Sequence, residues 1–301
     1  WNDRKFKFAS PRRKTKKFKL IMNIGNLLNQ GVEKLKDSNI QNANLDCELL
    51  LSKIINEGRE YVILNSKKDL NKKHIDFFNN LIERRKKGEP VAYLTNKKEF
   101  WKDIFYVNKN VLIPRPDSEH IIEEVIKNTY QDSKKHILDI GTGSGCVLLS
   151  ILKERKSFIG TGIDISKKCI KVSKYNAKRL KLQNSSKFYV SDIDNFLIGK
   201  YDVVVSNPPY IENLNLKYLD KDVVNFEPKL ALRGGKDGFS EIIKVIERTS
   251  SLIKKNGLFI IEIGYKQKNK VSKILKKKGF YIRKFLRDYA KNDRCIISTK
   301  I

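Results

Sequence analysis

The apolar residues in the first third of the chain are spaced as in helices. Between residues 24 and 88 they recur at intervals of three and four positions, which places them on one helical face. The predicted helices cover residues 24–35, 45–55 and 75–82, the third ending near Gly88-Glu89-Pro90. We expect Asn44 to cap the second helix. Such stripes are typical of a small core, and the region carries no catalytic motif.

The pattern changes between residues 91 and 113, where aromatic and β-branched residues stand among turn-prone Asn and Lys. This composition predicts a β-hairpin. Pro114 and Pro116 close the hairpin, and a helix is expected from about Asp117. The predicted organisation is a helical domain at 22–90, a hairpin connector at 91–116 and a larger domain at 117–301.

From residue 136 onward, short apolar runs alternate with amphipathic stretches, which predicts an α/β fold with a parallel sheet and crossover helices. Strands are predicted at 136–140, 158–163, 187–191, 201–206, 258–263, 280–286 and 294–299. Helices are predicted at 145–156, 166–181, 239–255 and 266–278. Because no helix separates the last two strands, we expect them to pair antiparallel. The predicted sheet is Rossmann-like and parallel except for one antiparallel strand.

Composition narrows the classes of protein to consider. The 301 residues are 40% hydrophobic and 32% charged, and no apolar stretch approaches the ~20 residues of a membrane span. The four cysteines form no close pair and the three histidines are scattered, so we expect no metal site and no disulfide framework. A cytoplasmic protein without membrane contact is the expectation.

The charge is strongly positive, with 63 Lys and Arg against 34 Asp and Glu and a net charge of +29. Such a balance favours acidic partners, so a weak contact of the basic surface with nucleic acid or the ribosome is one interpretation. A lysine-coated surface without a partner is the other. Composition does not decide between them.

Residues 1–21 differ from the rest of the chain because they are strongly basic and contain one acid. They lack the apolar segment of a secretory signal. The single methionine, Met22, follows them. We expect residues 1–21 to be a disordered basic extension upstream of a natural start at Met22. The alternative is a basic arm that contacts RNA.

The chemistry begins at the end of the predicted strand 136–140, where Gly141-Thr142-Gly143-Ser144-Gly145 follows directly. Ligands of open α/β sheets bind at this edge, and glycines let the backbone approach them closely. Asp139 precedes the glycines and is expected to hold the loop or to face an amino group of a cofactor. A glycine-rich turn alone also fits a dinucleotide site or a simple tight turn.

The next two predicted strands also end in acids. Asp164 stands 23 residues after Gly141, where a carboxylate can accept hydrogen bonds from both hydroxyls of a ribose. Asp192 ends the third strand and is expected to meet an adenine amino group, with Ile193 beside it. The plain alternative for each acid is a cap of its own turn. The order of the loop and Asp164 still indicates a nucleoside-containing cofactor.

The fourth strand, 201–206, leads directly into Asn207-Pro208-Pro209-Tyr210. Two prolines fix the backbone, so the Asn207 side-chain carbonyl and the Pro208 backbone carbonyl can accept both N–H groups of a planar nitrogen. That arrangement would align a poorly nucleophilic nitrogen with a sulfonium methyl group. Tyr210 can supply an aromatic wall. A proline-rich loop without function is the alternative reading of these four residues.

At this point the chain resembles the protein-glutamine N5-methyltransferases that act on class 1 peptide chain release factors. The resemblance runs from about Met22 to the C-terminus. It is carried by Pro90-Val91-Ala92-Tyr93-Leu94-Thr95, Lys98-Glu99-Phe100-Trp101, Leu112-Ile113-Pro114-Arg115-Pro116-Asp117-Ser118-Glu119, the glycine loop, Ser206 to Ile211, Phe226-Glu227-Pro228, and Arg287-Asp288-Tyr289 before Arg294.

The resemblance implies a class I methyltransferase fold with S-adenosyl-L-methionine as donor and S-adenosyl-L-homocysteine as product. The acceptor would be N5 of the glutamine in the Gly-Gly-Gln motif of a release factor, recognised with help from the helical domain. The implied donor-binding residues are Gly141, Thr142, Gly143, Ser144, Gly145, Asp164, Asp192, Ile193 and Asn207. The implied catalytic residues are Asn207, Pro208 and Tyr210, and the acceptor would contact these together with Pro209 and Arg115.

Two positions depart from the family pattern. Ile193 stands where relatives often have a large aromatic residue, which weakens the expected adenine stacking. Asn96 replaces a common glycine and concerns a hairpin turn rather than the chemistry. Arg115 is expected either to orient the pocket entrance or to brace the hairpin.

Other functions compatible with the Asn-Pro-Pro-Tyr motif remain open at this level. A ribosomal-protein glutamine methyltransferase is the nearer alternative. A DNA adenine-N6 methyltransferase is the other, although such enzymes extrude the base and usually carry a target-recognition domain. A module that only binds RNA or the ribosome would not require Asp164 and Asn207 together. We expect a monomeric enzyme.

Overall fold

The computed structural model describes residues 22–288 and 290–301. The predicted basic extension at 1–21 and Tyr289 lie outside the described residues. The described chain forms two compact units that divide between Lys86 and Lys87. Among the described residues no helix has both the length and the apolar character needed to cross a membrane.

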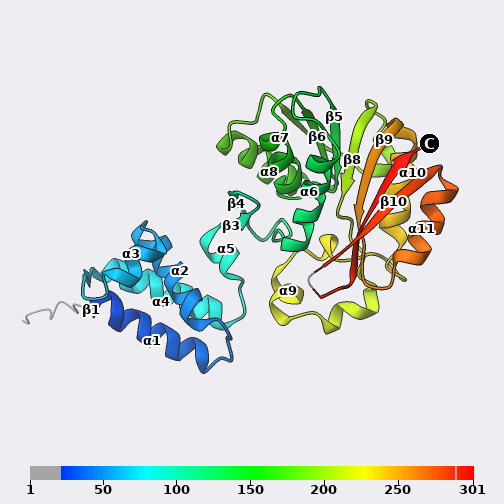
Figure 1. The fold of residues 1–301 in the computed structure, drawn as a ribbon. Coiled ribbons are helices and arrows are strands. Elements are labelled where there is room, and N and C mark those ends of the chain that lie inside the picture. The colour runs from blue at the N-terminus through cyan, green and yellow to red at the C-terminus, as the bar shows by residue number, and fades with distance from the viewer. Residues whose placement is uncertain (1–21, 289) are drawn as a thin grey trace, which may run out of the picture. The chain divides into compact units, whose positions relative to one another are not determined.

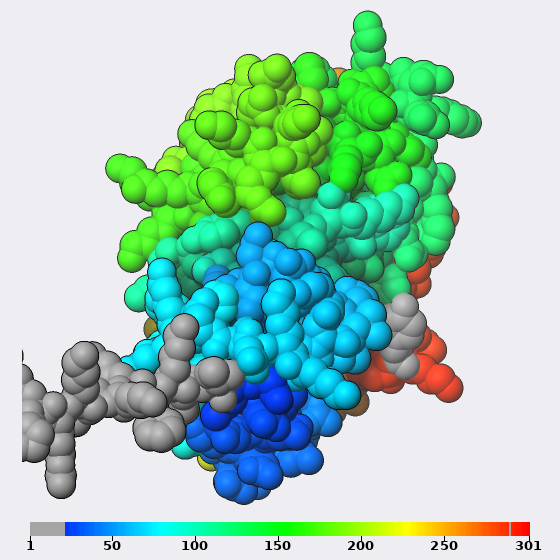
Figure 2. Space-filling view, turned by 90° about the vertical axis from the view of Figure 1, so that its left-hand side faces the viewer, coloured from blue at the N-terminus to red at the C-terminus, as the bar shows by residue number. Residues whose placement is uncertain are grey.

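The first unit is a bundle of helices with a short two-stranded pairing. Its elements are β1 (Met22–Asn23), α1 (Ile24–Lys36), α2 (Ala43–Ile55), α3 (Arg59–Leu64), β2 (Asp69–Leu70) and α4 (Lys72–Lys86). Gly31 lets α1 approach its neighbours, because a Cβ there would lie 2.8 Å from the Phe78 ring and 3.0 Å from Cys47 Sγ. In Figure 2 the side chains of α1, in dark blue, lie against the lighter blue and cyan helices that follow.

The predicted helices of this unit are present, but the predicted cap is wrong. Asn44 lies inside the first turn of α2, and the cap position belongs to Asn42, whose side chain makes no capping bond. Two side chains that do cap helices here are Asn23, which accepts a hydrogen bond from the Asn26 amide at 2.8 Å, and Asn71, which accepts one from the His74 amide of α4 at 2.9 Å. The short helix α3 was not predicted.

The second unit contains a helix at the start of the region predicted as a β-hairpin connector. Residues Val91–Thr95 form α5, which starts after Pro90 and ends at Asn96 in the left-handed region with φ +57°. The fixed φ of Pro90 suits a helix start, and Asn tolerates the left-handed conformation that ends it. The hairpin itself is confirmed as β3 (Lys97–Phe100) and β4 (Asp103–Tyr106), which pair antiparallel.

The sheet of the second unit has the strand order β10-β11-β9-β8-β5-β6-β7 in the described chain. Its strands are β5 (His136–Ile140), β6 (Ile159–Asp164), β7 (Ser186–Val190), β8 (Tyr201–Ser206), β9 (Ile253–Glu262), β10 (Phe280–Arg287) and β11 (Asp293–Lys300). Neighbouring strands from β9 to β7 are parallel, whereas β11 is antiparallel to both β9 and β10. The predicted parallel sheet with one antiparallel strand is therefore confirmed.

Helices cover both faces of this sheet (Figure 1). One core lies under α6 (Glu119–Lys127), α7 (Cys146–Glu154) and α8 (Lys167–Arg179), and the hairpin residues Phe100 and Phe105 belong to it. The other core lies under α10 (Ser240–Leu252) and α11 (Lys268–Lys277). The segment between β8 and α10 carries the short helices η3 (Asn213–Tyr218), α9 (Lys221–Phe226) and η4 (Lys229–Ala231).

The strand order reverses at β5, which has β6 on one side and β8 on the other. At such a point the loops after the strands turn to opposite faces and leave a crevice at the carboxyl edge of the sheet. The Ser206 hydroxyl donates to the Ile140 carbonyl at 2.8 Å and ties the ends of β8 and β5 together. The glycine loop after β5 and the Asn-Pro-Pro-Tyr segment after β8 therefore lie at one edge.

Candidate active site

The glycine loop is bent in a way that only glycine adopts easily. Gly141, Gly143 and Gly145 have φ of +74°, +55° and +80°, in the left-handed region that disfavours a Cβ. A Cβ built on Gly141 would meet no described atom within 4 Å, so the space over this residue is open. A bound molecule can therefore approach the backbone here, as the predicted donor site requires.

Asp164 braces this loop from the end of β6. One carboxylate oxygen accepts the Gly143 amide at 3.0 Å and the other accepts the Ser166 amide at 2.8 Å. Burial raises the pKa of Asp164, while these two backbone hydrogen bonds oppose the rise. Each carboxylate oxygen has a second lone pair, so the same group can also accept from ribose hydroxyls.

Asp139 and Thr142 make a buried pair behind the loop. The Thr142 hydroxyl donates to Asp139 Oδ2 at 2.6 Å, and Asp139 is 3% exposed. Burial raises the pKa of Asp139 to about 7; the Thr142 hydrogen bond opposes the rise and the nearby Asp164 adds to it. Ser144 is buried as well, and its carbonyl accepts from the Asn176 side chain at 2.9 Å. The hydrogen bonds of Asp139, Thr142 and Ser144 hold the glycine loop on its buried side.

The third predicted acid lies at a short 3-10 helix, η2 (Ile193–Asn195). Asp192 is its cap and accepts the Asp194 amide at 3.1 Å. Ile193 is 8% exposed and packs into the sheet core. The Ile193 side chain, expected beside adenine, therefore points largely into the core. Among the described residues the Asp192 side chain makes the contact of a helix cap, as the alternative interpretation predicts.

Asn207 follows the last residue of β8 with its amide in one defined orientation. Its Nδ2 donates to the Ser118 hydroxyl at 2.9 Å. No described residue donates a hydrogen bond to Asn207 Oδ1 or to the Pro208 carbonyl. Two carbonyl acceptors of the motif are therefore available to a ligand, while the amide nitrogen is used by the protein.

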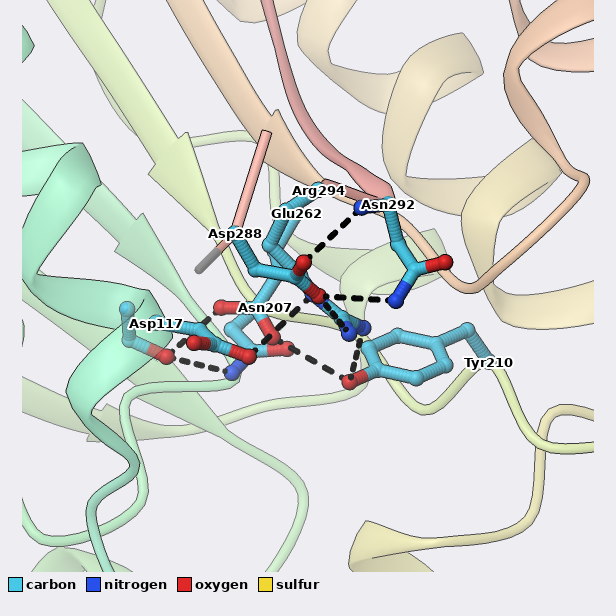
Figure 3. A network of polar contacts seen from close by, with 8 residues as sticks. Asp117, Asn207, Tyr210, Glu262, Asp288, Asn292 and Arg294 are labelled. Carbon is cyan, nitrogen blue, oxygen red and sulfur yellow. Dashed lines mark hydrogen bonds and ion pairs between the residues drawn. The ribbon is translucent and has the colours of Figure 1, made fainter. Parts of the chain in front are cut away.

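Tyr210 is held at both its ring and its backbone. Its hydroxyl donates to Glu262 Oε1 at 3.2 Å and accepts from Arg294 at 3.4 Å. Its carbonyl accepts from Gln267 at 3.1 Å. A Cβ on Gly234 would lie 2.7 Å from the Tyr210 carbonyl carbon, so only glycine fits there. The ring is thus fixed beside Glu262 (Figure 3).

Glu262, the last residue of β9, was not singled out in the sequence. It is 1% exposed and accepts the Ser118 hydroxyl at 2.6 Å through Oε2. Burial raises the pKa of Glu262 to about 7, while the Ser118 hydrogen bond, the charge of Arg294 and the Tyr210 hydrogen bond oppose the rise. A carboxylate directly after the apolar run Leu258-Phe259-Ile260-Ile261 is the signal that could have identified it.

Arg294 of β11 joins this group to two further acids. It pairs with Asp117 at 3.2 Å and with Asp288 at 2.6 Å. The Asn292 amide also binds Asp288, at 2.9 Å. Figure 3 shows the side chains of Asp117, Glu262 and Arg294 gathered beside those of Asn207 and Tyr210. The ion pairs with Asp117 and Asp288 stabilise the guanidinium, which explains why an arginine is tolerated with its side chain only 15% exposed.

Arg115 is tied to a different acid. It forms an ion pair with Glu227, whose side chain is 1% exposed. Glu227 also accepts the Ile113 amide at 3.1 Å. The segments Arg115-Pro116-Asp117 and Phe226-Glu227-Pro228, which carried part of the resemblance, therefore hold each other in place. These contacts favour the bracing role predicted for Arg115. In the described part of the chain no hydrogen bond or ion pair joins Arg115 to Asn207 or Tyr210.

Two family models match the chain. One is described as the PrmC N-terminal domain and matches residues 26–95, and the other is the methyltransferase small domain and matches residues 118–225. A solved structure with a similar fold is the ribosomal protein L11 methylase from Lactobacillus delbrueckii subsp. bulgaricus. It has a TM-score of 0.45 and 18% identity, covering 62% of this chain and 78% of that one.

Curated relatives align over nearly the whole chain. The release factor glutamine methyltransferase of Buchnera aphidicola subsp. Schizaphis graminum is 37% identical to this chain, and the alignment covers 93% of this chain and 100% of the relative. The proteins of the same name from Caulobacter vibrioides and Clostridium acetobutylicum are each 35% identical. The alignment with the Caulobacter protein covers 89% of this chain and 93% of the relative, and that with the Clostridium protein covers 93% and 99%.

Proposed function

The chain belongs to the release factor glutamine methyltransferase family, and we propose that it transfers a methyl group from S-adenosylmethionine to N5 of a glutamine side chain. The acceptor we propose is the glutamine of the Gly-Gly-Gln motif in class 1 peptide chain release factors. The observation that carries the proposal is the pair of available carbonyls at Asn207 and Pro208 beside an open glycine loop.

The pair of carbonyls suits a primary amide. The amide nitrogen has two N–H groups and a delocalised lone pair. Accepting both N–H groups would hold the nitrogen in one direction and favour the positive charge that develops on it as the bond to carbon forms. Positioning of the two reactants supplies a further part of the rate. The proton leaves after transfer, so no general base is required before it.

The donor would lie over the glycine loop. Gly141 to Gly145 would contact it through the backbone, and Asp164 would accept from its ribose hydroxyls. When bound, the donor supplies an electrophilic methyl group on a positively charged sulfur. That methyl group would lie toward Asn207, because the segments after β5 and β8 lie at one edge of the sheet.

The first unit, residues 22–86, would contribute to recognition of the release factor. This part of the proposal rests on the match of residues 26–95 to the PrmC N-terminal domain model. The Gly-Gly-Gln tripeptide is too small to select one protein among many, so contacts outside it must supply selectivity.

The proposal is tested by incubating the protein with labelled S-adenosylmethionine and, separately, a class 1 release factor, ribosomal proteins and duplex DNA. A release factor whose motif glutamine is replaced by alanine is the matched control. We expect label on the native release factor only. Label on ribosomal protein or DNA, with none on the release factor, would contradict the proposal.

A further inference from the structure

Hydrogen bonds from both ends of the Asn-Pro-Pro-Tyr segment converge on one buried carboxylate. From the first residue, Asn207 Nδ2 donates to the Ser118 hydroxyl at 2.9 Å, and that hydroxyl donates to Glu262 at 2.6 Å. From the last residue, the Tyr210 hydroxyl donates to the other oxygen of Glu262 at 3.2 Å. The four side chains come from three segments far apart in the sequence.

The direction of these hydrogen bonds follows from which groups can donate a proton and which can only accept one. Above its pKa of about 7 Glu262 is ionised and only accepts, so the single proton of the Ser118 hydroxyl must then point to Glu262. The Ser118 oxygen can then only accept, and the group of Asn207 that faces it must be the NH₂. Arg294 donates to the Tyr210 oxygen at 3.4 Å, which directs the Tyr210 proton to Glu262 in the same way.

We propose that Ser118 and Glu262 are positioning residues that fix which way the Asn207 carboxamide faces, so that its carbonyl oxygen meets the acceptor amide. This inference rests on the proposed function. The oxygen and nitrogen of an asparagine side chain are nearly equal in size, so sterics alone does not choose between the two orientations. Rotated by half a turn, Asn207 would place N–H donors against the N–H donors of the acceptor.

The surrounding contacts leave few other ways to fix this orientation. Among the described residues Ser118 is the only hydrogen-bond partner of the Asn207 side chain. Ser118 is 3% exposed, and Glu262 is 1% exposed, so water does not readily substitute for either. The charged groups that face Glu262 are Arg294 and Asp117, which pair with each other at 3.2 Å.

The kinetic test compares Ser118→Ala with Ser118→Thr, which keeps the hydroxyl. Ser298→Ala is the matched control, because Ser298 is a buried serine whose hydroxyl donates only to the Phe259 carbonyl at 3.2 Å. With release factor as acceptor, we expect S118A to lower kcat roughly tenfold, since one orienting hydrogen bond is lost. The KM for S-adenosylmethionine should stay within about twofold, and S118T and S298A should keep most of the wild-type kcat. A wild-type kcat in S118A, or equal losses in S118T and S118A, would overturn the proposal.

A second measurement requires no acceptor and separates this inference from the proposed function. In protein labelled with ¹⁵N-asparagine, the side-chain signal of Asn207 is identified by its absence in Asn207→Ala. We expect the Nδ2 proton that faces Ser118 to exchange slowly and to shift in S118A but not in S298A. An Asn207 signal that S118A leaves unchanged would overturn the proposal. If the shift is seen while the wild-type enzyme leaves release factor unmethylated, only the proposed function fails.

Discussion

Replacing Glu262 by glutamine should change how stability depends on pH. Burial raises the pKa of Glu262 from 4.5 to about 7, against the opposing effects of Ser118 and Arg294. Between these two values the folded protein keeps a proton that the unfolded chain releases. Stability should therefore fall as pH rises from about 4.5 to about 7 and level off above it. The neutral glutamine side chain of the variant does not titrate, so this dependence should be missing from it.

The size of the effect follows from the shift. A rise of about 2.5 pKa units corresponds to about 3 kcal/mol at ~1.36 kcal/mol per unit. Relative to wild type, E262Q should gain about this much free energy of unfolding between acid and neutral pH. Any packing or hydrogen-bond cost of the glutamine side chain is largely constant with pH and cancels in this comparison.

The assay is urea unfolding of both proteins by circular dichroism at several pH values between about 5 and 8. Asp139→Asn is a useful companion, because burial also raises the pKa of Asp139 to about 7, so the same sign is expected there. A difference between E262Q and wild type that stays flat across this pH range would refute the reasoning about Glu262.

Further predictions concern the two halves of the site. Asn207→Ala should lower kcat about 10²–10³-fold, the usual loss for one preorganised hydrogen-bonding group, while calorimetry still detects some binding of S-adenosylhomocysteine. Asp164→Ala should weaken that binding about 10–100-fold, because a charged hydrogen-bond acceptor is lost; unchanged affinity would exclude Asp164 from the donor site. Gly141→Ala should cost about 1 kcal/mol of stability at its φ of +74° and also weaken donor binding; a fully wild-type affinity would contradict the close approach of the donor to Gly141.

Most of the sheet could be predicted because its strands are short apolar runs with clear ends. The predicted bounds 136–140 and 201–206 coincide with β5 and β8, each followed by a glycine or proline turn. β9 was predicted from residue 258 but begins at Ile253. The residues after Ile253, Lys254-Lys255-Asn256-Gly257, have the composition of a turn. They are counted as strand because Ile253 pairs with Tyr201 on one side of them and Leu258 pairs with Val203 on the other.

The helix α5 shows where local pattern misleads. Residues 91–94 are apolar and precede a true hairpin, so the sequence predicts that the hairpin begins at residue 91. In the structure they form a short helix that tertiary contacts hold at its middle and its C-terminal end: the Tyr93 hydroxyl donates to the Val111 carbonyl at 2.6 Å and the Asn96 side chain donates to the Val107 carbonyl at 3.1 Å. A five-residue helix has no periodicity long enough to read.

The residues of the candidate site likewise fall into those that the sequence could predict and those that only the fold brings together. Gly141, Asp164 and Asn207 could be predicted as site residues from the sequence, because each lies at or directly after a strand end and strand ends define the ligand edge. Ser118 and Glu262 could not be connected, because 144 residues separate them and only the fold brings them within 2.6 Å. Ser118 lies in the segment 112–119, which carries part of the family resemblance, but the sequence predicts no role for it. Groups that act by holding other groups leave little local signal.

The most direct test of the proposed reaction is to locate the transferred methyl group. Release factor treated with the protein and S-adenosylmethionine would be digested and sequenced by tandem mass spectrometry, with the Asn207→Ala variant as the matched control. The account predicts one added methyl group on the side-chain amide of the Gly-Gly-Gln glutamine, and almost none with the variant. A methyl group on any other residue, or equal methylation by Asn207→Ala, would contradict it.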